Sequence, residues 1–266
     1  MKIKIIAEIG WNHMGDMELA KKMISEAASA GADIAKFQTW SVKDLINGPW
    51  DNDGRREIYE KAELSEKDHV ELKNTCESNG IEFLTSIFNV KHLEFLKSLG
   101  MGKIKIPSHE IYNIDLIKNV QSSFDFVLLS AGACKYEELL KSVNLVPREK
   151  LILMHCVSSY PLAKENVNLP KLDKLKSLSN VLGYSGHMVG IEDAIAAICK
   201  GSEFVEKHFT VDQNLPGRDN KNSILPQELK RLANFRNIFE KMNIDRGLDT
   251  QNIEMDIYNN YRGRWG

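Results

Sequence analysis

The sequence predicts an α/β protein in which eight parallel strands and eight helices close into a single (β/α)8 TIM barrel. Short apolar, β-branched runs alternate with amphipathic segments along the whole chain, with no change of composition that would mark a linker. The 266 residues match the length of about 250 that one such barrel needs. The first apolar run is followed by GWNHMG, which is not a Gly-rich phosphate loop, so a doubly wound open sheet is the disfavoured alternative.

The strands are predicted from short runs rich in Val, Ile, Leu and Phe that end at Gly, Pro or polar clusters. The first run is β-branched, alternates between polar and apolar residues, and has Glu8 near its end. The expected strands cover residues 2–9, 33–39, 81–86, 103–106, 124–130, 151–157, 181–184 and 203–208.

The helices are predicted from apolar residues at helical spacing. In the first helix, Leu19, Met23, Ile24 and Ala27 follow this spacing, and the pattern stops at Gly31. The expected helices cover residues 16–30, 65–78, 90–99, 111–120, 136–143, 170–178, 191–200 and 226–241. Residues 41–56 are expected to be a polar loop, and His69 and His92 are expected to face solvent.

These elements divide the chain into a catalytic barrel over residues 1–242 and a polar C-terminal tail over residues 243–266. The net charge of −2 argues against nucleic acid as a partner, because such binders usually carry a basic face. No apolar run approaches the roughly 20 residues that span a bilayer, and MKIKIIAEIG lacks a secretory cleavage pattern. With four scattered cysteines and no C-x-x-C, a cytoplasmic protein is expected.

Two histidines stand at the ends of successive strands. One strand runs into Ser185, Gly186 and His187, and the next ends on His208. Successive parallel strands carry their loops on the same face of the sheet, so the two imidazoles should lie close together. Two imidazoles with open coordination positions suit a catalytic divalent metal ion. We therefore predict a metal site at His187 and His208.

Polar residues are unusually frequent at the other expected strand ends. In a TIM barrel these ends form the face that carries the active site. The candidates are Glu8, Asn12, His13, Lys36, Gln38, Thr85, Ser86, Lys105, Ser108, His109, Glu110, His155, Ser158, Ser159, Tyr160 and Ser185. Stability alone does not explain such a set, which together with His187 and His208 comes from seven strands.

Lys36 and Lys105 lie inside strands that otherwise look buried. A buried ammonium group is costly unless an anion compensates it, so the pair predicts a substrate with phosphate or carboxylate groups. Hydroxyls of Ser108, Ser158 and Ser185 would add hydrogen-bond donors. The alternative is that each lysine pairs with a neighbouring carboxylate, such as Glu8 or Glu110.

Two covalent mechanisms are alternatives to a metal-assisted reaction. Lys36 or Lys207 could form a Schiff base, as in a class I aldolase. Because side chains alternate along a strand, Lys207 should face the helix layer if His208 faces inward. Cys156 could be a nucleophile, although a small apolar filler is the commoner role of a cysteine in a strand.

Six collinear segments then indicate a known family. They are AEIGWNHMGDMELAKKMI (residues 7–24), GADIAKFQTW (31–40), KIPSHEI (105–111), HCVSSYP (155–161), GYSGHM (183–188) and EKHFTVDQNLPGRD (206–219). Together they make the chain resemble the sialic acid synthase (N-acetylneuraminate synthase) family. The resemblance covers roughly residues 3–240.

The resemblance implies an enzyme and a chemistry. Members condense phosphoenolpyruvate with an open-chain N-acetylated amino sugar, typically N-acetylmannosamine, to give a sialic-type nonulosonic acid and phosphate. The histidines that match His187 and His208 hold a divalent metal, which we expect to be Mn²⁺, with Mg²⁺ or Co²⁺ as alternatives.

The resemblance also implies residue roles. Phosphoenolpyruvate would be held by Lys36, Ser86, Lys105, Ser108, Ser158 and Ser185. The sugar would be lined by Gln38, Glu110, Tyr160 and Asp219. Glu8 matches a carboxylate near the reacting centre, and whether Glu8 or Glu110 moves the protons stays open.

The sequence also departs from the family pattern. Members usually carry a C-terminal antifreeze-like domain that reaches over the partner's barrel in a homodimer, whereas this sequence stops after YNNYRGRWG. A separate lid or antifreeze-like partner is therefore expected, or closure of the site by Arg262 or Arg264. Ser158 stands where the family often has Asn, Ser86-Ile87-Phe88 replaces T-P-F, and Gly186 stands where Asp is common. Another 3-deoxy-sugar-acid synthase, a Schiff-base aldolase and a non-catalytic ligand-binding barrel remain alternatives.

Overall fold

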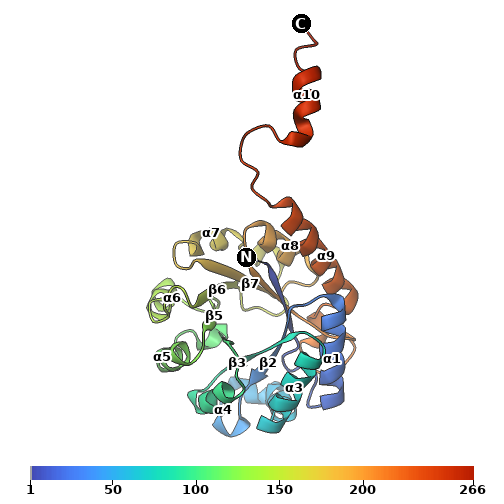
Figure 1. The fold of residues 1–266 in the computed structure, drawn as a ribbon. Coiled ribbons are helices and arrows are strands. Elements are labelled where there is room, and N and C mark those ends of the chain that lie inside the picture. The colour runs from blue at the N-terminus through green and yellow to red at the C-terminus, as the bar shows by residue number, and fades with distance from the viewer. Residues whose placement is uncertain (1) are drawn as a thin grey trace.

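The eight predicted strands form and close into one parallel barrel (Figure 1). The computed structural model describes residues 2–266. The strands pair in chain order, and β1 pairs with β8 to complete the ring. They are β1 (Lys4–Glu8), β2 (Ile34–Thr39), β3 (Glu82–Ile87), β4 (Lys103–Ile106), β5 (Phe126–Ser130), β6 (Leu151–Cys156), β7 (Val181–Gly186) and β8 (Phe204–His208). The prediction of a (β/α)8 barrel is confirmed.

Eight helices surround the strands, one after each (Figure 1). They are α1 (Met17–Ala30), α3 (Glu66–Ser78), α4 (Leu93–Ser98), α5 (Ile114–Ser123), α6 (Tyr136–Val143), α7 (Pro170–Leu175), α8 (Glu192–Cys199) and α9 (Pro226–Met242). Local chemistry sets their ends. Ser65 and Asp68 cap α3 reciprocally, as the sequence predicts, and Gly31 ends α1 at a φ of 95° that favours glycine.

The barrel interior has an apolar half and a polar half. A plug of seven buried side chains fills the apolar half: Ile6, Ile34, Leu84, Leu128, Ile152, Met154 and Phe204. Five polar residues each lie two positions after a residue of the plug: Glu8, Lys36, Ser86, Ser130 and Glu206. Because side chains on a strand repeat every two residues, this polar layer faces inward above the plug. The plug therefore leaves the carboxyl ends of the strands as the open end of the barrel.

Side chains of helix α9 bond to residues at the amino ends of β1 and β2. Arg236 donates to the carbonyl oxygen of Ile3 at 3.2 Å and forms a partly buried ion pair with Asp33. Asp33 in turn accepts a hydrogen bond from the amide of Ile5 at 2.9 Å. Glu240 accepts from the amide of Ile3 at 2.7 Å. These contacts place the C-terminal end of α9 on the face opposite the carboxyl ends of the strands.

Two sequence expectations about the outer layer are wrong. The expected polar loop 41–56 contains the short helices η1 (Val42–Asp44) and η2 (Pro49–Asn52) and the start of α2 (Arg55–Ala62). The helix α2 forms because Ile58 and Ala62 are buried against the barrel. His69 is 1% exposed rather than solvated, because its ring bonds to the Thr39 hydroxyl at 2.7 Å.

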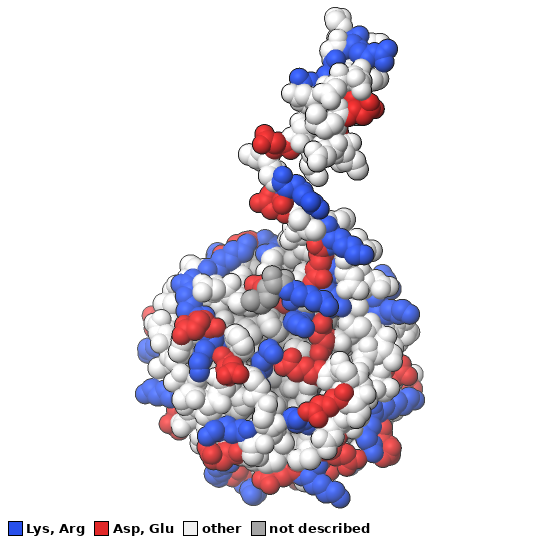
Figure 2. All heavy atoms as spheres, viewed as in Figure 1, with Lys and Arg blue, Asp and Glu red and all other residues white. Residues whose placement is uncertain are grey.

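The segment from residue 243 to residue 266 extends away from the barrel (Figures 1 and 2). It contains η7 (Asn252–Glu254) and α10 (Met255–Asn260), and every residue in it is exposed. Arg262 lies 3.9 Å over the Tyr258 ring, and Arg264 lies 5.5 Å from the Tyr261 ring. Because the segment follows the C-terminal end of α9, neither arginine reaches the open end of its own barrel.

Charged side chains of both signs are interspersed over the face seen in Figure 2. Across residues 2–266, no helix combines the length and the apolar character needed to cross a bilayer.

The ion pair between Asp33 and Arg236 provides a test of how α9 closes the barrel. Substitution Asp33→Asn leaves a buried guanidinium without its counter-charge, so we expect a loss of about 3 kcal/mol in the free energy of unfolding. Urea denaturation followed by circular dichroism measures this loss. A loss below about 1 kcal/mol would show that the ion pair between Asp33 and Arg236 does not hold α9 to the strands.

Candidate active site

A network of four buried charges lies directly above the apolar plug. The Lys36 ammonium is 2.7 Å from Glu8 and 3.7 Å from Glu206. The Lys105 ammonium is 2.5 Å from the other oxygen of Glu206. All four side chains are 5% exposed or less. Two ammonium groups and two carboxylates therefore balance one another inside the barrel.

Hydroxyl and amide groups extend this network around the barrel. Lys36 donates to the Ser86 hydroxyl at 3.1 Å, and Ser185 donates to Glu206 at 3.0 Å. Lys105 lies 3.5 Å from the Ser185 hydroxyl. On the opposite side, Gln38 donates to Glu8 at 2.6 Å. Side chains from β1, β2, β3, β4, β7 and β8 are thus joined in one polar layer.

The pKa values follow from this arrangement. Burial opposes ionisation of Glu206, but Lys105 and Lys36 outweigh it and lower the pKa of Glu206 to about 2. Burial also opposes the charge on Lys36, but Glu206 and Glu8 outweigh it and raise the pKa of Lys36. Burial lowers the pKa of Lys105. The charge of Glu206 opposes this shift, and the charge of Lys36 adds to it. The charged form of Lys105 is therefore less stabilised by its surroundings than that of Lys36.

A second group of hydroxyls lies at the ends of β4 and β6. The hydroxyls of Ser108 and Ser158 are 2.7 Å apart. Gly132, after β5, makes this contact possible, because a Cβ there would lie 2.7 Å from the Ser158 hydroxyl and 3.0 Å from Cys156 Sγ. The predicted pair of serine donors is thus assembled around a glycine.

The two predicted metal-binding histidines lie side by side. Their ring centroids are 5.5 Å apart. His187 Nδ1 bonds to the carbonyl oxygen of Val157 at 2.8 Å, so Nδ1 carries the proton and the Nε2 lone pair is left available. Burial, reinforced by His208, lowers the pKa of His187 to about 3, which keeps this imidazole neutral. The predicted proximity of the imidazoles is confirmed.

Three residues predicted to line a sugar lie on the imidazole side or beside Glu8. The Tyr160 ring centroid is 4.1 Å from that of His187, and Asp219 Oδ2 is 3.5 Å from His208 Nδ1. Gln38 bonds to Glu8. Tyr160, His187, His208 and Asp219 border a cavity of about 10 Å³, roughly the space of one water molecule.

Glu110 is the predicted site residue that stands apart. Its carboxylate accepts from the Asn113 side chain at 3.0 Å, and burial raises its pKa. Within residues 2–266 no hydrogen bond or ion pair joins it to Lys36 or Lys105. The alternative that each lysine pairs with a neighbouring carboxylate is confirmed, with Glu8 for Lys36 and with Glu206 rather than Glu110 for Lys105.

Three site residues were missed from the sequence. Glu206 precedes His208 by two positions, so the parity that places Lys207 outside also places Glu206 inside. Ser130 follows Leu128 of the plug by two positions, and its buried hydroxyl has no hydrogen-bond partner among the described residues. Gly132 gives no sequence signal, because its role depends on contacts between three loops.

The covalent alternatives fit this geometry poorly. A Schiff-base lysine must lose its proton, whereas two carboxylates raise the pKa of Lys36. Lys207 pairs with Asp193 of α8 outside the barrel, as its parity predicts. Burial raises the pKa of Cys156, which disfavours the thiolate that a nucleophile requires.

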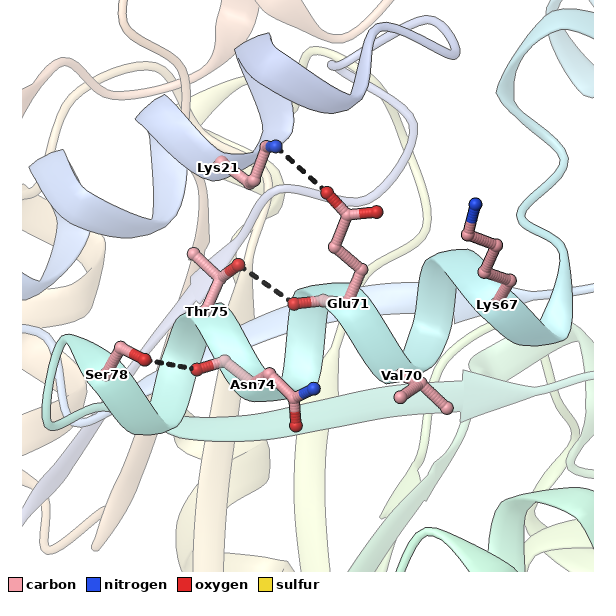
Figure 3. Close-up of a pocket in the computed structure, with 7 residues that line it drawn as sticks. All are labelled: Lys21, Lys67, Val70, Glu71, Asn74, Thr75 and Ser78. Carbon is pink, nitrogen blue, oxygen red and sulfur yellow. Dashed lines mark hydrogen bonds and ion pairs between the residues drawn. The ribbon is translucent and has the colours of Figure 1, made fainter.

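A larger hollow, of about 520 Å³, lies along the outer side of α3 (Figure 3). Its hydroxyls are already used locally: Thr75 donates to the Glu71 carbonyl and Ser78 to the Asn74 carbonyl. It lies in the outer helix layer, away from the charge network. The barrel mouth, although nearly filled by its own side chains, is therefore the better candidate site.

Within residues 2–266, no group of three or more His, Cys, Asp or Glu side chains is placed to hold a metal ion. The two imidazoles can supply at most part of a coordination shell, with water or substrate completing it.

A closed parallel barrel with a charged polar layer at its carboxyl ends defines a TIM-barrel enzyme. The model of the NeuB family matches residues 23–245, and the chain belongs to this family. The chain is 36% identical to the N,N'-diacetyllegionaminic acid synthase of Campylobacter jejuni, an alignment that covers 87% of this chain and 75% of the relative. It is 34% identical to the N-acetylneuraminate-9-phosphate synthase of Drosophila melanogaster, over 95% of this chain and 76% of that protein.

A solved structure agrees with these relatives. The N-acetylneuraminic acid synthetase of Leptospira borgpetersenii, crystallised with citrate, superposes with a TM-score of 0.89 at 35% identity. The match covers 99% of this chain and 93% of that chain. The predicted sialic acid synthase family and the prediction of an enzyme are confirmed.

Glu206 provides a test of the charge network. Glu206→Gln leaves two buried ammonium groups with one carboxylate, so we expect a loss of about 3–5 kcal/mol in unfolding free energy at pH 7. The folded pKa of about 2 lies below the ordinary value of 4.5, so the stabilisation is complete above about pH 4.5 and is lost as the pH falls toward 2. The deficit of the variant should therefore shrink below pH 4.5. Urea titrations of both proteins at pH 7 and pH 3 measure it, and a deficit that does not change with pH would contradict the network.

Proposed function

We propose that the protein condenses phosphoenolpyruvate with an open-chain N-acetylated amino sugar, N-acetylmannosamine or a relative, to give a nonulosonic acid and phosphate. The observation that carries the proposal is the pairing of two features at one barrel mouth. Buried lysines and hydroxyls suited to an anionic donor lie beside two neighbouring imidazoles suited to a divalent cation. Membership of the NeuB family supports the same chemistry.

The anionic donor is held by Lys36, Lys105 and the surrounding hydroxyls. Glu206 now accepts hydrogen bonds from Lys105 and Ser185, which are two of the groups proposed to bind phosphoenolpyruvate. The oxyanions of the donor replace this carboxylate as their acceptor. Ser86, Ser108, Ser130, Ser158 and Ser185 supply further hydroxyl donors for the phosphate and carboxylate oxygens.

The metal proposed at His187 and His208 is Mn²⁺, with Mg²⁺ or Co²⁺ as alternatives. The residues fit such an ion in two ways. His187 has a free Nε2 lone pair because its Nδ1 is bonded to Val157, and the buried Nδ1 of His208 has no hydrogen-bond partner among the described residues. When bound, a divalent cation acts as a Lewis acid on a carbonyl group.

The chain's own residues then orient the reactants and move protons. C3 of the donor bonds to the aldehyde carbon of the sugar, and the new hydroxyl oxygen takes one proton. Water adds at C2 and gives up one proton. The C2 hydroxyl then loses its remaining proton to the departing phosphate as the C2–O bond to phosphate breaks and the C2 carbonyl forms. Glu8, Glu110 and Glu206 are the carboxylates available for these transfers.

The sugar is proposed to lie against Gln38, Glu110, Tyr160 and Asp219. The Tyr160 ring covers His187, so this tyrosine must lie at the border between sugar and imidazoles. A cytoplasmic location, a homodimer and a separate antifreeze-like partner stay predictions.

The proposal is tested by phosphate release from phosphoenolpyruvate with N-acetylmannosamine and Mn²⁺. We expect one phosphate per nonulosonic acid formed. His208→Ala should lower the rate at least about a hundredfold, a loss typical of removing a group that stabilises transition-state charge. The matched control is His92→Asn, an imidazole in the outer layer of the barrel, which should keep the rate within about a factor of two.

Two results would overturn the proposal. Binding of phosphoenolpyruvate without phosphate release from any amino sugar would support a ligand-binding barrel. A borohydride-trapped adduct on Lys36 would support a Schiff-base aldolase instead.

A further inference from the structure

A second ion pair lies on the outer side of the barrel wall, behind the two imidazoles. Lys207 of β8 is 1% exposed, and the side chain of Asp193 on α8 is fully buried. The Lys207 ammonium lies 3.0 Å from both oxygens of Asp193 and donates to the carbonyl oxygen of Met188 at 2.6 Å. The Tyr184 hydroxyl donates to Asp193 at 2.9 Å. All three ammonium protons therefore have acceptors.

The ion pair contacts both neighbours of His187. Met188 follows His187 in the chain, and its carbonyl oxygen is bound by Lys207. Gly186 precedes His187, and a Cβ there would lie 2.4 Å from the Asp193 carboxylate and 2.6 Å from the Tyr184 ring. The carboxylate thus packs directly against the backbone at Gly186. Since Lys207 is itself the neighbour of His208, one ion pair touches the backbone beside both imidazoles.

Stability alone does not account for this pair. A buried ion pair is often no more stabilising than apolar residues of similar size, and the best-attested use of such pairs is to fix register. The register fixed in this case is that of the His187 loop against β8. A barrel wall of β7, β8 and α8 packed only by apolar residues would leave the loop at residues 187–190 without this anchor.

We propose that Asp193 and Lys207 are positioning residues that hold His187 and His208 at the spacing needed to bind one cation. This inference rests on the proposed function, because it assigns the imidazoles to a common ligand. The Lys207 ammonium is bonded to Met188 and Asp193, although the residue also borders the small cavity beside His187 and His208. Both act through the backbone at Gly186 and Met188.

The test compares Asp193→Asn with the native protein by two measurements. The first is the affinity for Mn²⁺ alone, measured by electron paramagnetic resonance. The second is the tautomer of His187 without metal, read from long-range ¹H–¹⁵N spectra of the imidazoles. We expect Mn²⁺ affinity to fall at least about tenfold, as with other residues that orient metal ligands. We also expect His187 to lose its single Nδ1–H tautomer.

Asp33→Asn is the matched control, because it also breaks an ion pair, one that is partly buried and lies at the opposite end of the barrel. It should lower stability while leaving Mn²⁺ affinity within about twofold and the His187 tautomer unchanged.

Two results would overturn the inference. Asp193→Asn could retain native affinity and tautomer, or Asp33→Asn could lose as much affinity as Asp193→Asn. If the native protein binds no Mn²⁺, the proposed metal site fails, and the tautomer measurement still decides whether Asp193 positions His187.

Discussion

The carboxylate of Glu206 lies between two buried ammonium groups, and the polar half of the barrel depends on it. Without it, Lys36 would keep only Glu8 as a counter-charge, and Lys105 would have no carboxylate within ion-pair distance among the described residues. Buried charges persist only when they are paired. The network therefore holds two ammonium groups at the barrel mouth, where an anionic ligand can replace a carboxylate as their partner.

The network in turn depends on the apolar plug beneath it. Since Leu128, Ile152 and the other plug residues fill the amino-terminal half, polar side chains can face inward only near the carboxyl ends. Side chains alternate between the inside and the outside along each strand, and this alternation decides which residues enter the site. The same alternation places Lys207 outside, where it pairs with Asp193 and contacts the loop that carries His187. Strand β8 thus carries both Glu206, the counter-charge inside the barrel, and Lys207, which bonds to the His187 loop on the outside.

Much of this could be predicted from the sequence, because barrel geometry converts position along a strand into position in space. His187 and His208 were expected together on that ground, and they are. Glu206 and Ser130 could have been found by the same parity. Gly132 could not, because its value lies in contacts between loops after three different strands. The helix α2 and the burial of His69 depend on tertiary packing, which local patterns do not encode.

The most direct measurement is anomalous diffraction from crystals soaked with Mn²⁺ and phosphoenolpyruvate. The account predicts one manganese peak within coordination distance of His187 and His208, and a phosphate whose oxygens contact Lys36 or Lys105. It also predicts that Glu206 has given up its hydrogen bond from Lys105. A donor bound away from both lysines, or a manganese ion bound elsewhere, would contradict it.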